Sequence, residues 1–538
     1  MLGNAMENVP SPASGAPAPS ATTGQSAGAG REYPEKLDGA LLRIAGVCGL
    51  AMVMAVLDST IVAVAQRTFI ADFGSTQAVV GWTMAGYMLA FATVIPITGW
   101  AADRFGSKRL FITSVLVFTL GSLLCAMAPT ILLLIIFRMV QGAGGGMLVP
   151  LSFAVITREA GPKRLGRLVA VGGIPMLLGP VGGPILGGWL IGAYGWKWIF
   201  LINVPIGLLV IALALIFFPT DQPGAAEPFD VVGVLLLSPG LVIFLFGMSS
   251  ISVRGTIADP NVLGPAVLGL ALIAAFVVHA CYRTDHPLID LRLFQNRVLT
   301  QANVTMLIFT TAAFGSLLLL PSYFQLVLHK TPIQSAVYML PQGIGAMSTL
   351  PLAGILMDKR GPGRIVLVGI PLIAVGLSIV SFGVARQDAY VPTLLVGMAV
   401  IGMGMGCIVT PLTAVSVQTL PPHQIARGST LVNVNQQVGG SIGTALMSMV
   451  LTNQFNRSEN ITAANKLASL KQKAANGVPI DPAAIPRQSL RPGFSADVLH
   501  DFSHAYATVF MIAVILVAAV IIPASFLPKK PAIHTQDV

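Results

Sequence analysis

The sequence predicts an all-α integral membrane protein of fourteen transmembrane helices, arranged as two six-helix bundles with two further helices inserted between them. Three observations support this prediction. Apolar runs of roughly 20 residues recur along the chain, charged residues are scarce, and a short glycine-containing motif occurs twice. An apolar helix of about 20 residues spans the roughly 30 Å hydrocarbon core of a bilayer.

The composition leaves too few charges for a soluble protein of this length. Of the 538 residues, 54% are hydrophobic and 10% are charged, whereas soluble domains carry about 25% charged residues. A bilayer resolves the difficulty because its hydrocarbon favours apolar outer faces. The four cysteines, all in or beside apolar runs, form neither a disulfide framework nor a metal-ligand spacing.

The apolar runs predict the following order along the chain. Residues 1–36, rich in Pro, Ala, Gly and Ser, form a disordered tail, 37–218 the first bundle, 219–298 the inserted pair and 299–538 the second bundle. The predicted spans are 41–65, 78–101, 109–128, 130–156, 168–191, 198–218, 231–251, 262–282, 299–321, 332–357, 364–385, 390–414, 428–452 and 504–527.

The net charge of +10 follows membrane topology rather than a nucleic-acid partner. Basic residues gather in alternate short connections instead of one patch, which is the positive-inside pattern. The connection 219–230 departs from it, with three acidic and no basic residues, but acidic residues weigh little in orientation. The pattern predicts a plasma (inner) membrane protein with both termini cytoplasmic and a long extracellular loop at 453–503.

An internal repeat supports the helix count. Gly99, Asp103, Gly106 and Arg109 recur with the same spacing as Gly354, Asp358, Gly361 and Arg364. The two copies follow the second and tenth predicted helices, so they are eight helices apart. In a simple six-plus-six arrangement they would be six apart. The two inserted helices are therefore assigned to 231–251 and 262–282.

The first copy of the repeat resembles the signature loop of the major facilitator superfamily, although Ser107 stands where that family usually has a basic residue. The resemblance implies a loop that holds the cytoplasmic ends of helices together during alternating access. The alternative is a charged loop that only sets topology. The residues of this gating segment are Gly99, Asp103, Arg104, Gly106, Lys108 and Arg109.

The fourth and fifth predicted helices carry two further motifs. Arg138-Met-Val-Gln141-Gly142 resembles the superfamily motif whose buried Arg takes part in proton coupling; a structural anchor is the alternative, since a charge in mid-membrane is costly. The fifth helix resembles the antiporter motif of exporters, and close helix packing is its alternative. The antiporter-motif residues are Gly179, Gly183, Pro184, Gly187 and Gly188.

The first helix, with Leu57-Asp58-Ser59-Thr60-Ile61-Val62, is similar to that of the fourteen-helix drug:proton antiporters, the EmrB/QacA-type branch. Ala63 and Arg67 depart from that pattern. The stretch from Trp196 to Gly207 resembles the exporter sequence that enters the sixth helix, and similar matches continue along most of residues 41–527.

Asp58 and Arg138 are the two formal charges that the predicted spans place well inside the membrane. Each lies about eight residues from the outer end of its span, roughly 12 Å at 1.5 Å per residue, so the two can meet. Burial favours a neutral carboxyl and a neighbouring guanidinium favours a charged one, so a moving partner can switch protonation. The hypothesis is that Asp58 takes a proton from outside and yields it when substrate enters from the cytoplasm. A fixed structural ion pair is the alternative.

Polar side chains within apolar helices are weaker candidates for the substrate cavity. An unpaired amide in hydrocarbon is costly, so each should face protein or a water-filled cleft. Interhelical hydrogen bonding is an equally good interpretation. The candidates are Gln141, Asn303, Gln342, Asn433, Asn435 and Gln436.

Together these features indicate a secondary active exporter of amphipathic drugs that uses the proton gradient and needs no cofactor or metal. No GxxxxGK[ST] sequence is present for ATP-driven transport, and nothing suggests an enzyme. The alternative cargo is physiological: a lipid, a siderophore or a metabolite. Besides substrate, protons and the bilayer, an accessory export protein is a partner that this branch of the family leaves open.

Overall fold

The computed structural model describes residues 38–160, 168, 182–220, 228–254, 258–284, 287–317, 319–418, 420, 424–475 and 485–529. Its helices in the first half are α1 (Gly39–Phe73), α2 (Gln77–Phe105), α3 (Ser107–Ala126), α4 (Ile131–Ala160), α6 (Trp198–Leu201) and α7 (Asn203–Phe217). The central pair is α8 (Val231–Arg254) and α9 (Pro260–Tyr282), followed by the short η1 (Leu291–Gln295). The second half contains α10 (Arg297–Leu317), α11 (Leu320–Leu326), α12 (Pro332–Tyr338), α13 (Leu340–Arg360), α14 (Pro362–Ala385), η2 (Tyr390–Leu394), α15 (Leu395–Gln418), α16 (Ile425–Arg457), α17 (Glu459–Ala475), η5 (Arg487–Leu490), α18 (Phe494–Ala519) and α19 (Ile521–Ala524).

The all-α membrane fold is confirmed. Within the described part of the chain, 12 helices are long and apolar enough to cross a membrane, and they coincide with twelve of the predicted spans. The predicted span 428–452 lies within the 33-residue α16, which lacks an equally apolar stretch. The predicted span 168–191 falls largely outside the described residues, although 182–194 are helical. The number fourteen stays a prediction.

Each half is held together by glycines that bring three helices into backbone contact. In the first half, a Cβ at Gly142 or Gly146 would collide with the α2 carbonyl oxygens of Tyr87 and Phe91. In the second half, Gly402 on α15 approaches the α13 carbonyl oxygen of Gln342 in the same way. Glycine at four-residue steps permits this approach because it has no side chain.

The two sets of glycine contacts share one register. Gly142 and Gly402 are 260 positions apart, and their partners Tyr87 and Gln342 are 255 apart, which is also the spacing from Gly99 to Gly354. The pair α2 and α4 therefore corresponds to the pair α13 and α15, and α3 corresponds to α14.

The structure corrects several predicted boundaries. The gating segment is not a loop: Asp103 and Arg104 belong to α2, Lys108 and Arg109 belong to α3, and Gly106 alone separates the helices with φ 88°. The second copy breaks likewise at Gly361, with φ 84°. Both breaks occur at glycine because L side chains rarely adopt positive φ.

Two other predicted segments extend differently from what the apolar pattern suggests. Helix α1 continues past Ala65, where the sequence predicts its end, to Phe73. The predicted loop 453–503 is largely helical, since it contains the end of α16, all of α17 and the start of α18. Hydropathy could not show these helices because their residues are too polar to resemble a span.

In the central pair, α8 packs against α9 and against one helix from each half, α2 and α16. Ser238 on α8 donates a hydrogen bond to the Thr93 carbonyl of α2 at 2.8 Å. His279 of α9 has its Nε2 2.9 Å from Oδ1 of Asp230, the residue directly before α8. The first contact joins the hairpin to the first half, and the second joins the end of α9 to the start of α8.

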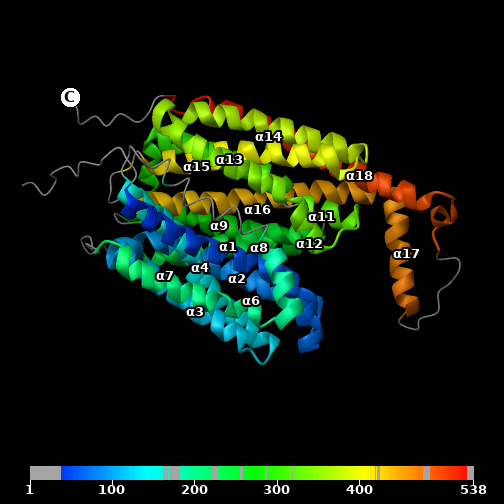
Figure 1. Ribbon diagram of the computed structural model, residues 1–538, viewed down its shortest axis with the longest axis horizontal. Helices are drawn as coiled ribbons and strands as arrows, with labels where there is room; N and C mark the ends of the chain where they lie inside the picture. Colours follow the sequence, from blue (N-terminus) through cyan, green and yellow to red (C-terminus); the bar gives the residue numbers. More distant parts are fainter. Residues whose placement is uncertain are drawn as a thin grey trace, which may run out of the picture. The chain divides into compact units, whose positions relative to one another are not determined.

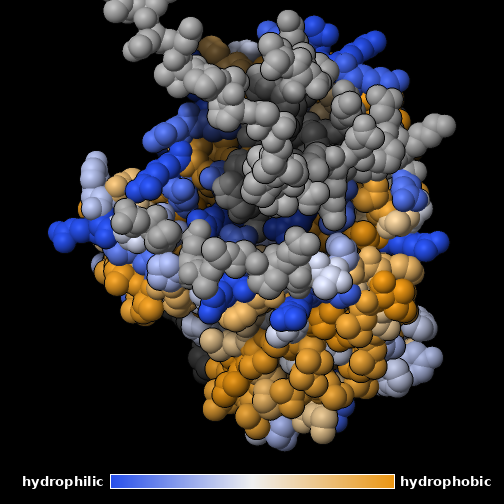
Figure 2. All heavy atoms as spheres, turned by 90° about the vertical axis from the view of Figure 1, so that its left-hand side faces the viewer, coloured by the Kyte–Doolittle hydropathy of each residue, from blue (hydrophilic) through white to orange (hydrophobic). Residues whose placement is uncertain are grey.

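The helices of the bundle have two distinct ends. Figure 1 shows α1 beginning at the same end at which α18 finishes, whereas α17 lies at the opposite end, across the direction of the long helices. Figure 2 looks onto the first of these ends, where hydrophilic residues gather while apolar residues cover the flank below. This distribution fits helices whose sides contact lipid and whose ends contact water.

Candidate functional site

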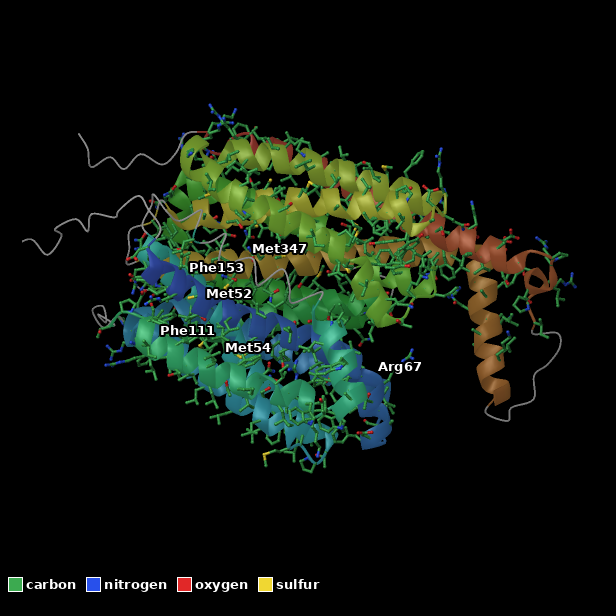
Figure 3. The ribbon with its side chains drawn as sticks, in the orientation of Figure 1. Met52, Met54, Arg67, Phe111, Phe153 and Met347 are labelled. Atoms are coloured by element: carbon green, nitrogen blue, oxygen red, sulfur yellow. The ribbon has the colours of Figure 1, made fainter. Side chains whose placement is uncertain are left out.

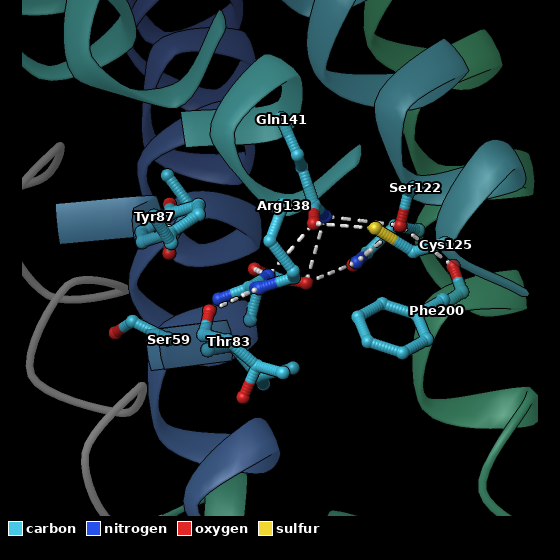
Figure 4. Close-up of polar contacts among 12 residues, drawn as sticks. Ser59, Thr83, Tyr87, Ser122, Cys125, Arg138, Gln141 and Phe200 are labelled. Carbon is cyan, nitrogen blue, oxygen red and sulfur yellow. Dashed lines mark hydrogen bonds and ion pairs between the residues drawn. The ribbon is translucent and has the colours of Figure 1, made fainter. Parts of the chain in front are cut away.

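A buried ion pair joins α1 to α4 in the first half. Arg138 Nη1 lies 2.5 Å from Asp58 Oδ2, and neither side chain is exposed to solvent. Arg138 reaches this position because the glycines that follow it let α2 and α3 close around α4. Figure 4 shows the contacts that surround the pair. The two charges that the depth argument places at one level therefore meet.

The second carboxylate oxygen of Asp58 is held by two amides. Oδ1 accepts hydrogen bonds from Gln141 Nε2 and Asn203 Nδ2, each at 2.9 Å. Ser122 Oγ on α3 accepts from the same two amides, at 3.1 and 3.0 Å, and donates to the Phe200 carbonyl at 2.9 Å. Donors from α4 and α7 and the guanidinium of Arg138 thus converge on one carboxylate.

The guanidinium of Arg138 is fixed on its other sides as well. Nε donates to the Thr83 carbonyl at 3.1 Å, and Nη1 also donates to Gln141 Oε1 at 2.7 Å. Its plane lies over the Tyr87 ring, 4.1 Å from the centroid, a cation–π contact. Tyr87 itself donates to the Ala55 carbonyl of α1 at 3.3 Å. The site is a polar network inside an apolar bundle, in which Arg138 Nη2 and Asn203 Oδ1 are buried and have no hydrogen-bond partner among the described residues.

The ion pair and the amide bonds hold α1, α4 and α7 together. Asp58 pairs with Arg138 and accepts from the two amides. Without a charged carboxylate beside it, Arg138 would be a buried cation that has lost its partner, which destabilises such a network. The charge of this pair and the packing of α1 against α4 therefore depend on each other.

The gating segment connects the two halves. Asp103 Oδ2 on α2 lies 3.3 Å from Arg427 Nε at the start of α16. A Cβ added to Gly99 would lie 3.2 Å from the Arg427 Cα, so the helix ends touch closely there. Lys108 donates to the carbonyls of Leu215 and Phe218 at 2.9 and 2.8 Å, at the end of α7. The remaining basic residues, Arg104 and Arg109, are exposed.

The described part of the antiporter motif packs onto α1 beside Asp58. A Cβ at Gly183 would collide with Thr60, and one at Gly187 would lie 3.2 Å from Ile61 Cγ2. Gly188 faces Ile333 of α12 in the second half, where a Cβ would lie 2.6 Å from Cδ1. Pro184 belongs to the same helical segment, 182–194, and Gly179 lies outside the described residues.

Among the amide candidates for the substrate cavity, the structure brings Asn303 and Asn435 into contact. Gln141 belongs to the Asp58 network. Asn435 donates to the Asn303 carbonyl at 2.7 Å, which joins α16 to α10. Asn433 bonds within its own helix, to Ser429. Two further amides contact methionine sulfur, Gln342 that of Met405 at 3.3 Å and Gln436 that of Met306 at 3.9 Å. Hydrogen bonding within and between helices accounts for the amide contacts.

Sequence reasoning missed four residues of the network: Thr83, Tyr87, Ser122 and Asn203. Asn203 alone carried a signal, because it stands in the stretch that resembles the exporter sequence. A buried amide at the start of an apolar helix is costly unless it is bonded, so it could have been assigned a polar partner. Ser122 and Thr83 are small residues that a transmembrane helix accommodates anywhere, so their sequence gives no such signal.

Apolar helices of membrane length that enclose an ionisable pair are typical of secondary transporters. A family model described as Major Facilitator Superfamily matches residues 48–444. The chain is 64% identical, over 538 residues, to the Multidrug resistance protein B homolog of Mycobacterium tuberculosis, covering 100% of this chain and 99% of that protein. It is 30% identical over 430 residues to the Multidrug export protein EmrB of Escherichia coli, covering 79% and 83% of the two chains.

The solved structure of the proton:xylose symporter XylE resembles the model with a TM-score of 0.54, covering 91% of this chain and 96% of that one. At 13% sequence identity this likeness shows the fold alone. The chain therefore belongs to the major facilitator superfamily, in the EmrB-type branch, and is a multi-pass membrane transporter.

Proposed function

We propose that this protein exports amphipathic drugs in exchange for protons, by alternating access. Its relatives named for multidrug resistance and multidrug export support the cargo class. The buried Asp58–Arg138 pair is the observation that supports proton coupling, because it is an ionisable pair enclosed in the bundle. Nothing in this proposal requires a bound cofactor.

In the proposed cycle, a proton from outside neutralises Asp58 and releases Arg138 from its carboxylate. The repacking of α1 against α4 opens the inner side, where substrate enters. Substrate binding favours the charged carboxylate again, and the proton leaves to the cytoplasm. The cycle needs two discrete arrangements whose balance protonation shifts, which is the general requirement for such a switch.

The contact between Asp103 and Arg427 supports the alternating-access part of the proposal. It joins α2 to α16, one helix from each half, at a single end of the bundle. In the proposed cycle this ion pair forms when the inner end closes and separates when it opens. Because both side chains are partly exposed, water can replace the bond between them, so the free energy of separating the pair is small.

Proteoliposomes test the coupling. Purified protein in vesicles with an imposed pH gradient should move cationic dyes, and Asp58→Asn should insert normally yet lose the gradient-driven component. Arg67→Gln is the control, since Arg67 is exposed toward the end of α1 away from Met52 (Figure 3). Full gradient-driven transport by Asp58→Asn would mean that the Asp58–Arg138 pair has only a structural role. If the protein transports endogenous lipids and not dyes, the proposed cargo is wrong, while the proposed proton coupling still stands.

The orientation of the chain, with both termini cytoplasmic in the plasma membrane, is tested separately. A cysteine at exposed Ser469 on α17 should react with an impermeant thiol reagent added to intact cells. A cysteine at exposed Lys359, at the end of α13, should react only after the cells are opened. The reverse labelling pattern would invert the proposed orientation.

A further inference from the structure

A groove lies in the second half between α13, α14 and α15, on the other half from the ion pair. Its volume is about 270 Å³, which is below the roughly 300–1,000 Å³ of pockets for drug-sized molecules. Leu352 and Val368 on its walls are 56% and 59% exposed, so the groove opens toward the lipid that surrounds a membrane protein. Among the lining residues are Leu352, Leu356, Arg360, Arg364, Val368 and Cys407.

The groove is apolar along its length and basic at one end. Arg360 is the last residue of α13 and Arg364 lies in the first turn of α14, so both guanidinium groups belong to the helix ends. Leu352 lies eight residues before Arg360, about 12 Å along the helix. Both arginines are exposed, and neither forms an ion pair with another described residue. An apolar groove with cationic groups at the membrane surface is complementary to a molecule that has one anionic head group and an apolar chain.

The first half carries a bulkier side chain at the position that corresponds to the inner wall of the groove. In the shared register, Cys407 on α15 corresponds to Met147 on α4, which is 260 positions earlier. Met147 accepts a hydrogen bond from Ser114 of α3 at 3.6 Å and packs in the first-half core. Cys407 has a shorter side chain than Met147, and Arg360 ends α13 at the position where Phe105 ends α2. The second half thus has a smaller side chain in place of methionine and a charged side chain in place of an aromatic one.

We propose that this groove binds one anionic phospholipid, with an acyl chain between α13 and α14 and the phosphate on Arg360 and Arg364. Arginine suits this role because its planar fork of donors matches phosphate oxygens in a bidentate bond. In the proposed orientation the arginines face the cytoplasmic leaflet, whose anionic lipids attract basic residues near the membrane surface. The lipid would fasten the break at Gly361 between α13 and α14, since its head bridges the two helices there.

Lipid retention tests the proposal directly. The full-length protein, purified and delipidated in detergent, is titrated with palmitoyl-oleoyl phosphatidylglycerol or phosphatidylcholine, and bound lipid is counted by native mass spectrometry. The wild-type protein should hold one phosphatidylglycerol about tenfold more tightly than phosphatidylcholine. Arg360→Gln with Arg364→Gln should abolish this preference. Cys407→Met introduces the methionine found in the first half and changes no charge. It should reduce retention of phosphatidylglycerol because the longer side chain occupies the groove.

Two controls separate the groove from general basic attraction. Lys359→Gln removes an exposed cation beside Arg360 that does not line the groove, so it should behave as the wild-type protein does. Glycerol phosphate, which lacks chains, should not displace the lipid when added in tenfold excess. Equal losses in Lys359→Gln and the double arginine variant would overturn the proposal. So would wild-type retention by both Cys407→Met and the arginine variant, or displacement by glycerol phosphate.

Discussion

The two halves of the transporter share the same glycine contacts between helices but differ in the side chains that these helices enclose. Gly142 and Gly402 bring α4 onto α2 and α15 onto α13 in one register. In that register Arg138 of the first half corresponds to Met398 of the second, since both lie four residues before these glycines. Arg138 and Met398 are both fully buried, yet one is a cation and the other is apolar.

The same contrast holds one helical turn further along. Gln141, which bonds Asp58, corresponds to Ile401, which packs in the apolar core of the second half. The glycine positions thus set the same approach of α4 to α2 and of α15 to α13, although the enclosed side chains differ. The comparison teaches that the ionisable network of the first half occupies a helix arrangement that the second half forms around apolar side chains.

The largest expected effect comes from giving the first half the apolar residue of the second. Arg138→Met leaves the Asp58 carboxylate buried without its cation, and breaking a buried pair in this way costs about 3–5 kcal/mol. Thermal unfolding of purified protein in detergent should show a large fall in midpoint. The double variant Asp58→Asn with Arg138→Met should recover most of the loss. A single variant as stable as wild type would mean that the pair contributes nothing to packing.

Adding a methyl group to the shared glycines should have an intermediate effect in both halves. Gly142→Ala and Gly402→Ala each force a Cβ against a backbone carbonyl, and overpacking of this kind costs about 1–3 kcal/mol. Gly46→Ala is the matched control, because no atom lies within 4 Å of its added Cβ. Denaturation midpoints of the three variants test the common register. Destabilisation confined to one half would contradict it.

A smaller effect is expected from Asn203→Ala, which removes one donor from Asp58 and leaves the ion pair in place. A hydrogen bond to a charged group contributes about 1.5–3 kcal/mol, and the neighbouring donors should offset part of this. The denaturation midpoint of purified Asn203→Ala should therefore fall, but by less than that of Arg138→Met. A midpoint equal to that of the wild-type protein would mean that Asn203 does not support the carboxylate.

The smallest change in free energy is expected at the gating segment, and it should differ between the halves. The Asp103–Arg427 pair is partly exposed, so its loss should cost about 0.2–1 kcal/mol and slow transport by no more than about fivefold. Asp103→Asn should insert normally and transport more slowly. Asp358→Asn should be milder, because the sequence after Asp358 departs further from the family pattern. Normal rates in both variants would remove the gating role.

The sequence predicts most of the fold because lipid imposes length and apolarity on each span. It also predicts that Asp58 and Arg138 meet, since a charge in hydrocarbon requires a partner and few were available. It could not assign Ser122 to the network, because a small hydroxyl is accommodated anywhere in a transmembrane helix. For Asn203 it indicates a polar partner but does not identify Asp58 as that partner. Nor could it place the amides of α10 and α16, whose partners depend on helix rotation.

Helix α16 has a consequence for how the chain is built into the membrane. It is the least apolar of the long helices in the bundle, with Asn, Gln and Gly along its middle. Its closest neighbours are α10, α2 and α8, and all three precede it in the chain. A segment this polar enters lipid poorly by itself, and its amides require partners. Because these neighbours are synthesised first, α16 enters a membrane that already holds the helices against which it packs.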